Sequence, residues 1–214
     1  MKKALFILSA FLIIFICVSL LIYKVGNMPQ PAEEVSGEID VSSEPVQEKY
    51  AGEKFQITID DTTFTIEPVA GYNGSFLVVG KKYYYGSPED KLVPLDLCVV
   101  WGKLAEPENL KHITFSIQAG RWCSFSYSGE MVLEGSYIDS HFANIHAIPA
   151  TENILKALKS VEKKEKIYLE GFLVNIYHGE RCLLRTSLTR EDTGSGACEI
   201  FYVIKVVIGN AIYQ

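Results

Sequence analysis

The sequence contains no C-x-x-C pair and no excess of basic residues, and each absence excludes a class of protein. Without cysteines at that spacing, neither a zinc knuckle nor a thioredoxin-like redox site is expected. Once the four lysines and seven acids of residues 1–53 are set aside, residues 54–214 keep 16 basic and 19 acidic side chains. That balance provides neither the basic surface expected of a nucleic-acid-binding protein nor the cluster of basic residues that binds anionic lipid.

A signal-peptidase site is missing after a long apolar run near the N-terminus. Twenty uncharged residues, Ala4 to Tyr23, follow Lys2-Lys3 and end at Lys24. As a helix rising about 1.5 Å per residue, this run is long enough for a bilayer core of about 30 Å. No Ala-x-Ala follows it, so we expect residues 1–24 to be a retained single-pass anchor in a bacterial cytoplasmic membrane, with cleavage as the alternative. The leading lysines predict that the rest of the chain lies outside the cytoplasm.

Aromatic residues are nearly absent from residues 25–53, where acidic residues and prolines are frequent. This segment has seven acids against one lysine, and it contains three prolines. Such a stretch buries too little apolar surface to offset the entropy lost on ordering it. The sequence therefore predicts an acidic, disordered linker, followed by an extracytoplasmic domain over residues 54–214.

The domain has a hydrophobic pattern that repeats mainly every two residues, which is typical of strands. Strands are predicted over residues 55–59, 64–66, 95–101, 113–117, 123–127, 166–177 and 198–208. In the strand 166–177 the phase of the alternation changes at Gly171, which predicts a bulge there. We expect a mainly β (α+β), antiparallel domain, and an OB-like barrel is an architecture of suitable size.

One segment of the domain has the period of a helix. Thr151 is a suitable N-cap, and lysines near residue 163 suit the C-terminal end of the helix dipole. Its apolar face would consist of Ile154, Leu155, Leu158 and Val161. We expect this short helix to pack on the sheet as part of the core.

Four cysteines follow the apolar run, at positions 98, 123, 182 and 198, and they allow three pairings. Cys182 and Cys198 flank a single loop, so a disulfide between them is one prediction. The alternative is that all four are small buried hydrophobic residues.

Two polar clusters interrupt the apolar pattern. The first, residues 140–146, could ligate a metal or supply a base and its orienting group, but no third ligand is evident, so no metal or other cofactor is predicted. The second, residues 186–199, could bind a small polar ligand. In both clusters the alternative is a loop held by local hydrogen bonds. The candidate ligand or partner site consists of His141, Asn144, His146, Arg190, Asp192 and Thr193.

The segment from His178-Gly179 to Ser195-Gly196-Ala197-Cys198 faintly resembles the signature of L,D-transpeptidases, exported enzymes that cross-link peptidoglycan with a cysteine nucleophile. That family has a histidine and a glycine directly before the cysteine, whereas Gly196 and Ala197 stand here. Glu199 follows the cysteine, and a carboxylate there would oppose formation of a thiolate. The sequence therefore disfavours this use of Cys198.

Three strings resemble a group of uncharacterised bacterial proteins with an N-terminal apolar segment ahead of a β-rich domain. They are Pro94-Leu95-Asp96-Leu97 with Trp101-Gly102; Ser140-His141 with Ala143-Asn144, His146 and Ile148-Pro149-Ala150; and Ser187-Leu188-Thr189-Arg190 with Asp192-Thr193-Gly194, Gly196 and Ala197-Cys198-Glu199. The resemblance implies no activity. It does imply that the polar residues of the second and third strings are features of the group.

The leading functional prediction is a membrane-tethered binding module of the cell envelope, whose partner is an envelope protein or a small ligand. The alternative is an envelope hydrolase or transferase that uses His141 or His146 with Asp192. A purely structural subunit is a third possibility.

Overall fold

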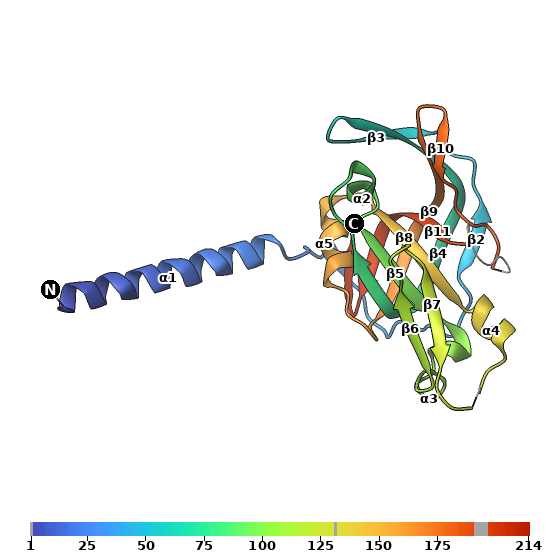
Figure 1. Ribbon diagram of the computed structural model, residues 1–214, viewed down its shortest axis with the longest axis horizontal. Coiled ribbons are helices and arrows are strands. Elements are labelled where there is room, and N and C mark those ends of the chain that lie inside the picture. Colours follow the sequence, from blue (N-terminus) through green and yellow to red (C-terminus); the bar gives the residue numbers. More distant parts are fainter. Residues whose placement is uncertain (1, 131, 191–196) are drawn as a thin grey trace.

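The computed structural model describes residues 2–130, 132–190 and 197–214, and it shows one long helix beside a β-rich domain (Figure 1). The helix, α1 (Lys2–Gly26), extends away from the domain. The C-terminal end of α1 lies beside α5 (Glu152–Ser160), where Lys156 Nζ donates to the Gly26 carbonyl at 2.8 Å. Among the described residues, no helix combines the length and the apolarity required to cross a membrane.

Five strands form a closed ring, which confirms the mainly β prediction. In ring order they are β4 (Thr62–Tyr83), β5 (Leu95–Val100), β8 (Phe142–Pro149), β11 (Glu199–Ile208) and β9 (Lys166–His178), which pairs again with β4. All neighbours are antiparallel except β8 and β11, which are parallel. The wholly antiparallel prediction is wrong for this pair, because α5 carries the chain from β8 to the far side of β11 before β9 begins.

Alternate residues of the ring strands face its interior and its exterior. The interior residues join the main core, to which α5 adds Ile154, Ala157 and Leu158. The helix prediction is confirmed, and the Thr151 side chain accepts a hydrogen bond from the Ile154 backbone N–H at 3.1 Å. On β5, β8 and β11 the interior residues are Leu95, Leu97, Val99, Ala143, Ile145, Ala147, Phe201 and Val203. Polar side chains are left on the outer face of the same three strands.

Several short elements cover the outside of the ring. The hairpin of β6 (Ile113–Ile117) and β7 (Cys123–Tyr127) lies over the outer face of β5, where Ile113 and Phe115 pack with Cys98 and Val100. The predicted opening hairpin is confirmed as β3 (Phe55–Ile59) paired with the start of β4. The others are α2 (Pro88–Leu92), η1 (Gly102–Ala105), α3 (Pro107–Leu110), α4 (Gly135–Ser140), β10 (Arg181–Leu184) and β12 (Ala211–Tyr213).

Residues 25–53 run along the domain, so the prediction of a disordered linker is wrong for its paired parts. β1 (Glu33–Glu34) pairs with β12, and β2 (Val46–Lys49) pairs with β4. The side chains of β1 and β2 are exposed, as their composition predicts. Their order comes from backbone hydrogen bonds to strands that offer free N–H and C=O groups, a source of order that composition does not reveal.

The disulfide joins Cys98 of β5 to Cys123 of β7, with 5.8 Å between their Cα atoms. The predicted Cys182–Cys198 bridge is wrong. Cys182 lies on the hairpin β9–β10 with its sulfur directed to the Leu184 carbonyl, whereas Cys198 approaches β8. Both of these cysteines are free thiols.

Gly171 is required by a close approach and not by a bulge in its own strand. A Cβ at this position would lie 2.0 Å from the Tyr202 carbonyl oxygen of β11. The register shifts lie in the neighbouring strands, between Val203 and Lys205 of β11 and between Pro68 and Ala70 of β4. The phase change in β9 arises because its two ends are buried on opposite faces, in the main core and in a second cluster.

Candidate functional site

The candidate site lies on the outer face of β5, β8 and β11, where register places polar residues of distant segments side by side. Asp96 of β5 pairs with His146 of β8, and His146 pairs with Ile200 of β11. Cys198 stands two residues before Ile200, just ahead of β11, and it lines the same cavity as His146 and Ile200. The strand register thus brings a carboxylate, an imidazole and a thiol to one place.

Asp96 and His146 form a buried pair. His146 Nδ1 lies 2.7 Å from Asp96 Oδ1, and the Asp96 side chain is completely buried. Burial by itself lowers the pKa of His146, but hydrogen bonds and charge from Asp96 and Cys198 outweigh it and raise that pKa to about 9. The imidazole is therefore positively charged at neutral pH.

Arg121, in the turn between β6 and β7, is the second partner of Asp96. Its Nη2 and Nε donate to the two carboxylate oxygens at 2.6 and 3.1 Å, and Nη2 also donates to the Val93 carbonyl at 2.8 Å. The guanidinium lies over the ring of Tyr84, 3.9 Å from its centroid. Burial tends to raise the pKa of Asp96, but hydrogen bonds from His146 and Arg121 lower it overall, so the carboxylate stays ionised.

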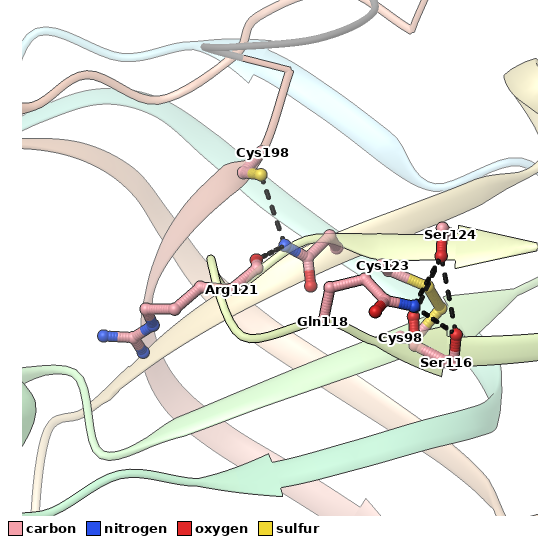
Figure 2. Close-up of a disulfide and its surroundings, with 8 residues drawn as sticks. Cys98, Ser116, Gln118, Arg121, Cys123, Ser124 and Cys198 are labelled. Carbon is pink, nitrogen blue, oxygen red and sulfur yellow. Dashed lines mark hydrogen bonds between the residues drawn. A yellow bond between two sulfur atoms is a disulfide. The ribbon is translucent and has the colours of Figure 1, made fainter.

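Asn144 connects the turn to the thiol. Its Nδ2 donates to the Arg121 carbonyl at 2.6 Å and lies 3.2 Å from Cys198 Sγ. Figure 2 shows Cys198 beside Arg121, near the Cys98–Cys123 disulfide. Within the described part of the chain, the buried Asn144 Oδ1 has no hydrogen-bond partner. The disulfide thus fixes β7 and the turn from which Arg121 reaches Asp96.

A cavity of about 420 Å³ opens directly on this group. His146, Cys198 and Arg121 lie in its wall. The remaining wall is largely apolar and comes from α2 and the loop after it, from the turn beside Trp122, and from β10; it includes Phe64, Leu92, Val93, Ile176, Leu183, Leu184 and Ile200. A smaller hollow of about 280 Å³, lined by Asn144 and Arg190, lies on the other side of Cys198, which lines both.

The predicted site residues are divided between this group and a second one. Asn144 and His146 belong to the group described above. His141 and Arg190 meet through Glu44, whose oxygens lie 3.1 Å from His141 Nε2 and 3.0 Å from Arg190 Nη1. The two histidines therefore contact different partners, and a single site that contains both stays a prediction.

The remaining predicted residues, Asp192 and Thr193, lie outside the described residues, so their part in any site stays a prediction. Sequence reasoning missed Asp96 and Arg121 and disfavoured Cys198. A signal for Asp96 was present, because an acidic residue inside an apolar strand is costly to bury without partners. Arg121 had no comparable signal.

Among residues 2–130, 132–190 and 197–214, no three His, Cys, Asp or Glu side chains are arranged to hold a metal ion. The group instead has the parts of a thiol site, in which a carboxylate orients an imidazole that stands beside a sulfur. Comparison with protein-family models, curated proteins and solved structures finds no match to this chain. The proposals below therefore rest on the geometry and on the sequence.

Proposed function

We propose that this chain is a membrane-tethered, OB-type binding domain of the cell envelope, and that the cavity beside His146 is its ligand site. The location of the cavity relative to the strand order is the observation that carries the proposal.

The strand order supports an OB-type barrel. Numbered along the chain, the ring strands β4, β5, β8, β9 and β11 follow the order 1-2-3-5-4-1, with the third and fifth parallel. A helix, α5, lies between the third and fourth strands. This order agrees with a five-stranded Greek-key barrel of the OB type and so supports the proposal.

The cavity lies where such barrels bind their ligands, on the face of the second and third strands and between the loops 1–2 and 4–5. His146 comes from the third strand, and Asp96 behind it comes from the second. Leu92 and Val93 belong to the connection between the first two strands, and Leu183 and Leu184 belong to the connection between the fourth and fifth. α2, β3 and β10 gather at one end of the domain (Figure 1).

The lining favours a ligand with an apolar group and a carbonyl or carboxylate. Aliphatic side chains form most of the wall. Arg121, Arg185 and His146 supply positive charge or hydrogen-bond donors, against one carboxylate from Glu89. A cavity of about 420 Å³ falls in the size range of small-ligand sites. We expect an acylated amino acid, or the side chain and carbonyl of a bound peptide, to fit.

The test is a titration of the full chain in detergent with N-acetyl amino acids that bear aliphatic or aromatic side chains, followed by NMR. Leu183→Trp fills the cavity and should abolish binding, whereas Leu188→Trp, at a half-exposed position outside the lining, should not. An N-acetyl amino acid that binds, present at a concentration of one hundred times its Kd, should add about 2.7 kcal/mol to the free energy of unfolding. Equal binding by wild type and Leu183→Trp would show that the cavity is not the site.

The tether is supported by the uncharged run Ala4–Tyr23 and the lysines before it. The full chain should stay with bacterial membranes after an alkaline carbonate wash, and protease added to spheroplasts should remove the domain. A chain without residues 2–24 should be released. Recovery of the intact full chain in the cytosol would contradict this part of the proposal.

A further inference from the structure

We propose that Cys198 is a catalytic nucleophile that transfers or hydrolyses an acyl group bound in the cavity, with His146 as its acid–base partner and Asp96 as the positioning residue of His146. This inference rests on the proposed function, because the same cavity holds the acyl group.

The contacts form a continuous chain from the carboxylate to the cavity. Arg121 holds Asp96 by two hydrogen bonds, and Asp96 Oδ1 lies 2.7 Å from His146 Nδ1. With Nδ1 occupied by Asp96, the other ring nitrogen, Nε2, is left for the thiol. Both His146 and Cys198 line the cavity, so an acyl group bound there is within reach of the sulfur.

Two groups beside the sulfur of Cys198 suit a nucleophile, the imidazole of His146 and the amide of Asn144. A thiol beside a positively charged imidazole loses its proton more readily, as in other cysteine–histidine pairs. His146 carries that charge because its pKa is raised to about 9. Asn144 Nδ2 lies 3.2 Å from Sγ and offers an N–H donor that a thiolate accepts better than a thiol.

Glu199, the acidic neighbour of Cys198, lines the smaller hollow together with it but does not line the cavity that Cys198 shares with His146. Glu199 is the first residue of β11. It shares the phase of Phe201 and Val203, which belong to the main core, and its charge acts on the buried Tyr72. The carboxylate therefore stays outside the lining of the cavity in which the acyl group is bound.

The three strings singled out in the sequence also converge on this site. Asp96 lies in the first, Asn144 and His146 in the second, and Cys198 in the third. The strand register, not their spacing in the chain, brings them together.

The chemistry requires no group beyond the substrate and water or an amine. The thiolate attacks the acyl carbonyl carbon, a C–S bond forms, and the bond to the leaving group breaks as the proton on His146 passes to that group. Water or an amine then attacks the thioester and gives its proton to His146. The C–S bond breaks, the acid or amide leaves, and the thiolate–imidazolium pair is restored.

The experiment compares thiols within one protein. The full chain in detergent is treated with limiting iodoacetamide from pH 5 to 9, and alkylation of each cysteine is followed by mass spectrometry. An ordinary thiol with a pKa near 8.5 is about 0.3% ionised at pH 6. Cys198 should therefore react at least about tenfold faster than Cys182 at pH 6, and His146→Gln should remove that advantage. A Cys198 rate no greater than that of Cys182 in the wild-type chain would overturn the inference without any variant.

A second measurement tests acyl transfer. p-Nitrophenyl acetate should release a burst of about one p-nitrophenolate per chain and leave an acetyl group on Cys198. Cys198→Ser should abolish the burst and Cys182→Ser should keep it. If N-acetyl amino acids bind in the cavity but neither the burst nor the fast alkylation occurs, this inference fails and the binding proposal stands. If nothing binds in the cavity yet Cys198 is acylated, the binding proposal fails instead.

Discussion

The pair between His146 and Asp96 should make stability depend on pH in a defined direction. The pKa of His146 is about 9 in the folded chain, against an ordinary value of 6.5. A raised pKa means that the stabilisation is fully present below pH 6.5 and is lost as the pH rises through 9. At about 1.4 kcal/mol per tenfold change in proton affinity, the difference is about 3 kcal/mol. Asp96 and Cys198 are the titratable groups that act directly on the ring.

Urea unfolding at pH values from 6 to 10, followed by the fluorescence of the buried Trp101, measures this contribution. The free energy of unfolding of the wild-type chain should fall by about 3 kcal/mol across that range. Asp96→Asn should remove most of the slope and also lower stability at pH 6 by about 3–5 kcal/mol, because Arg121 and His146 lose their buried partner.

Two comparisons keep this prediction testable. Glu108→Gln removes an exposed carboxylate paired with Lys111 and should leave the slope unchanged. His146→Gln should remove the slope even if Asp96→Asn does not fold. The reasoning is refuted if His146→Gln keeps the wild-type slope, or if NMR titration of the His146 ring gives a midpoint at or below pH 6.5.

Three further substitutions test the fold. Cys98→Ser removes a disulfide that spans 25 residues and should cost about 3 kcal/mol in urea unfolding, an effect that a reducing agent should reproduce in the wild-type chain only. Gly171→Ala places a Cβ against the Tyr202 carbonyl and should cost at least about 2 kcal/mol, whereas Gly71→Ala in the adjacent strand, with no atom nearer than 4.0 Å, should cost much less; equal losses would contradict the close approach. Thr151→Ala removes the N-cap of α5 and should lower the unfolding free energy by about 1 kcal/mol, with Thr151→Ser near the wild-type value.

The candidate site was only partly predictable. Asn144 and His146 were identified as members of a polar cluster that interrupts the apolar pattern, but the cluster was interpreted as a loop, and residues 142–149 form strand β8. Arg121 was missed because it reaches Asp96 from a turn 25 residues away, through a hairpin whose position over β5 depends on packing. Cys198 was disfavoured because its chain neighbour is acidic, although that neighbour does not line the cavity that Cys198 shares with His146.

The cysteine pairing and the order of residues 25–53 were also beyond sequence reasoning. Cys98 and Cys123 meet because β7 folds over β5, and no local pattern states which pairs of strands become neighbours. β1 and β2 are ordered by backbone hydrogen bonds, which any residue except proline can donate.

The sequence by itself determined the β-rich class, most strand positions and the helix with its Thr151 cap. These features depend on alternation and capping within a few residues, where side-chain chemistry acts directly. Only the tertiary structure decided the ring closure between β9 and β4, the Cys98–Cys123 bridge and the meeting of Asp96, His146 and Cys198. These depend on register between strands far apart in the chain, which is set by the packing of the whole core.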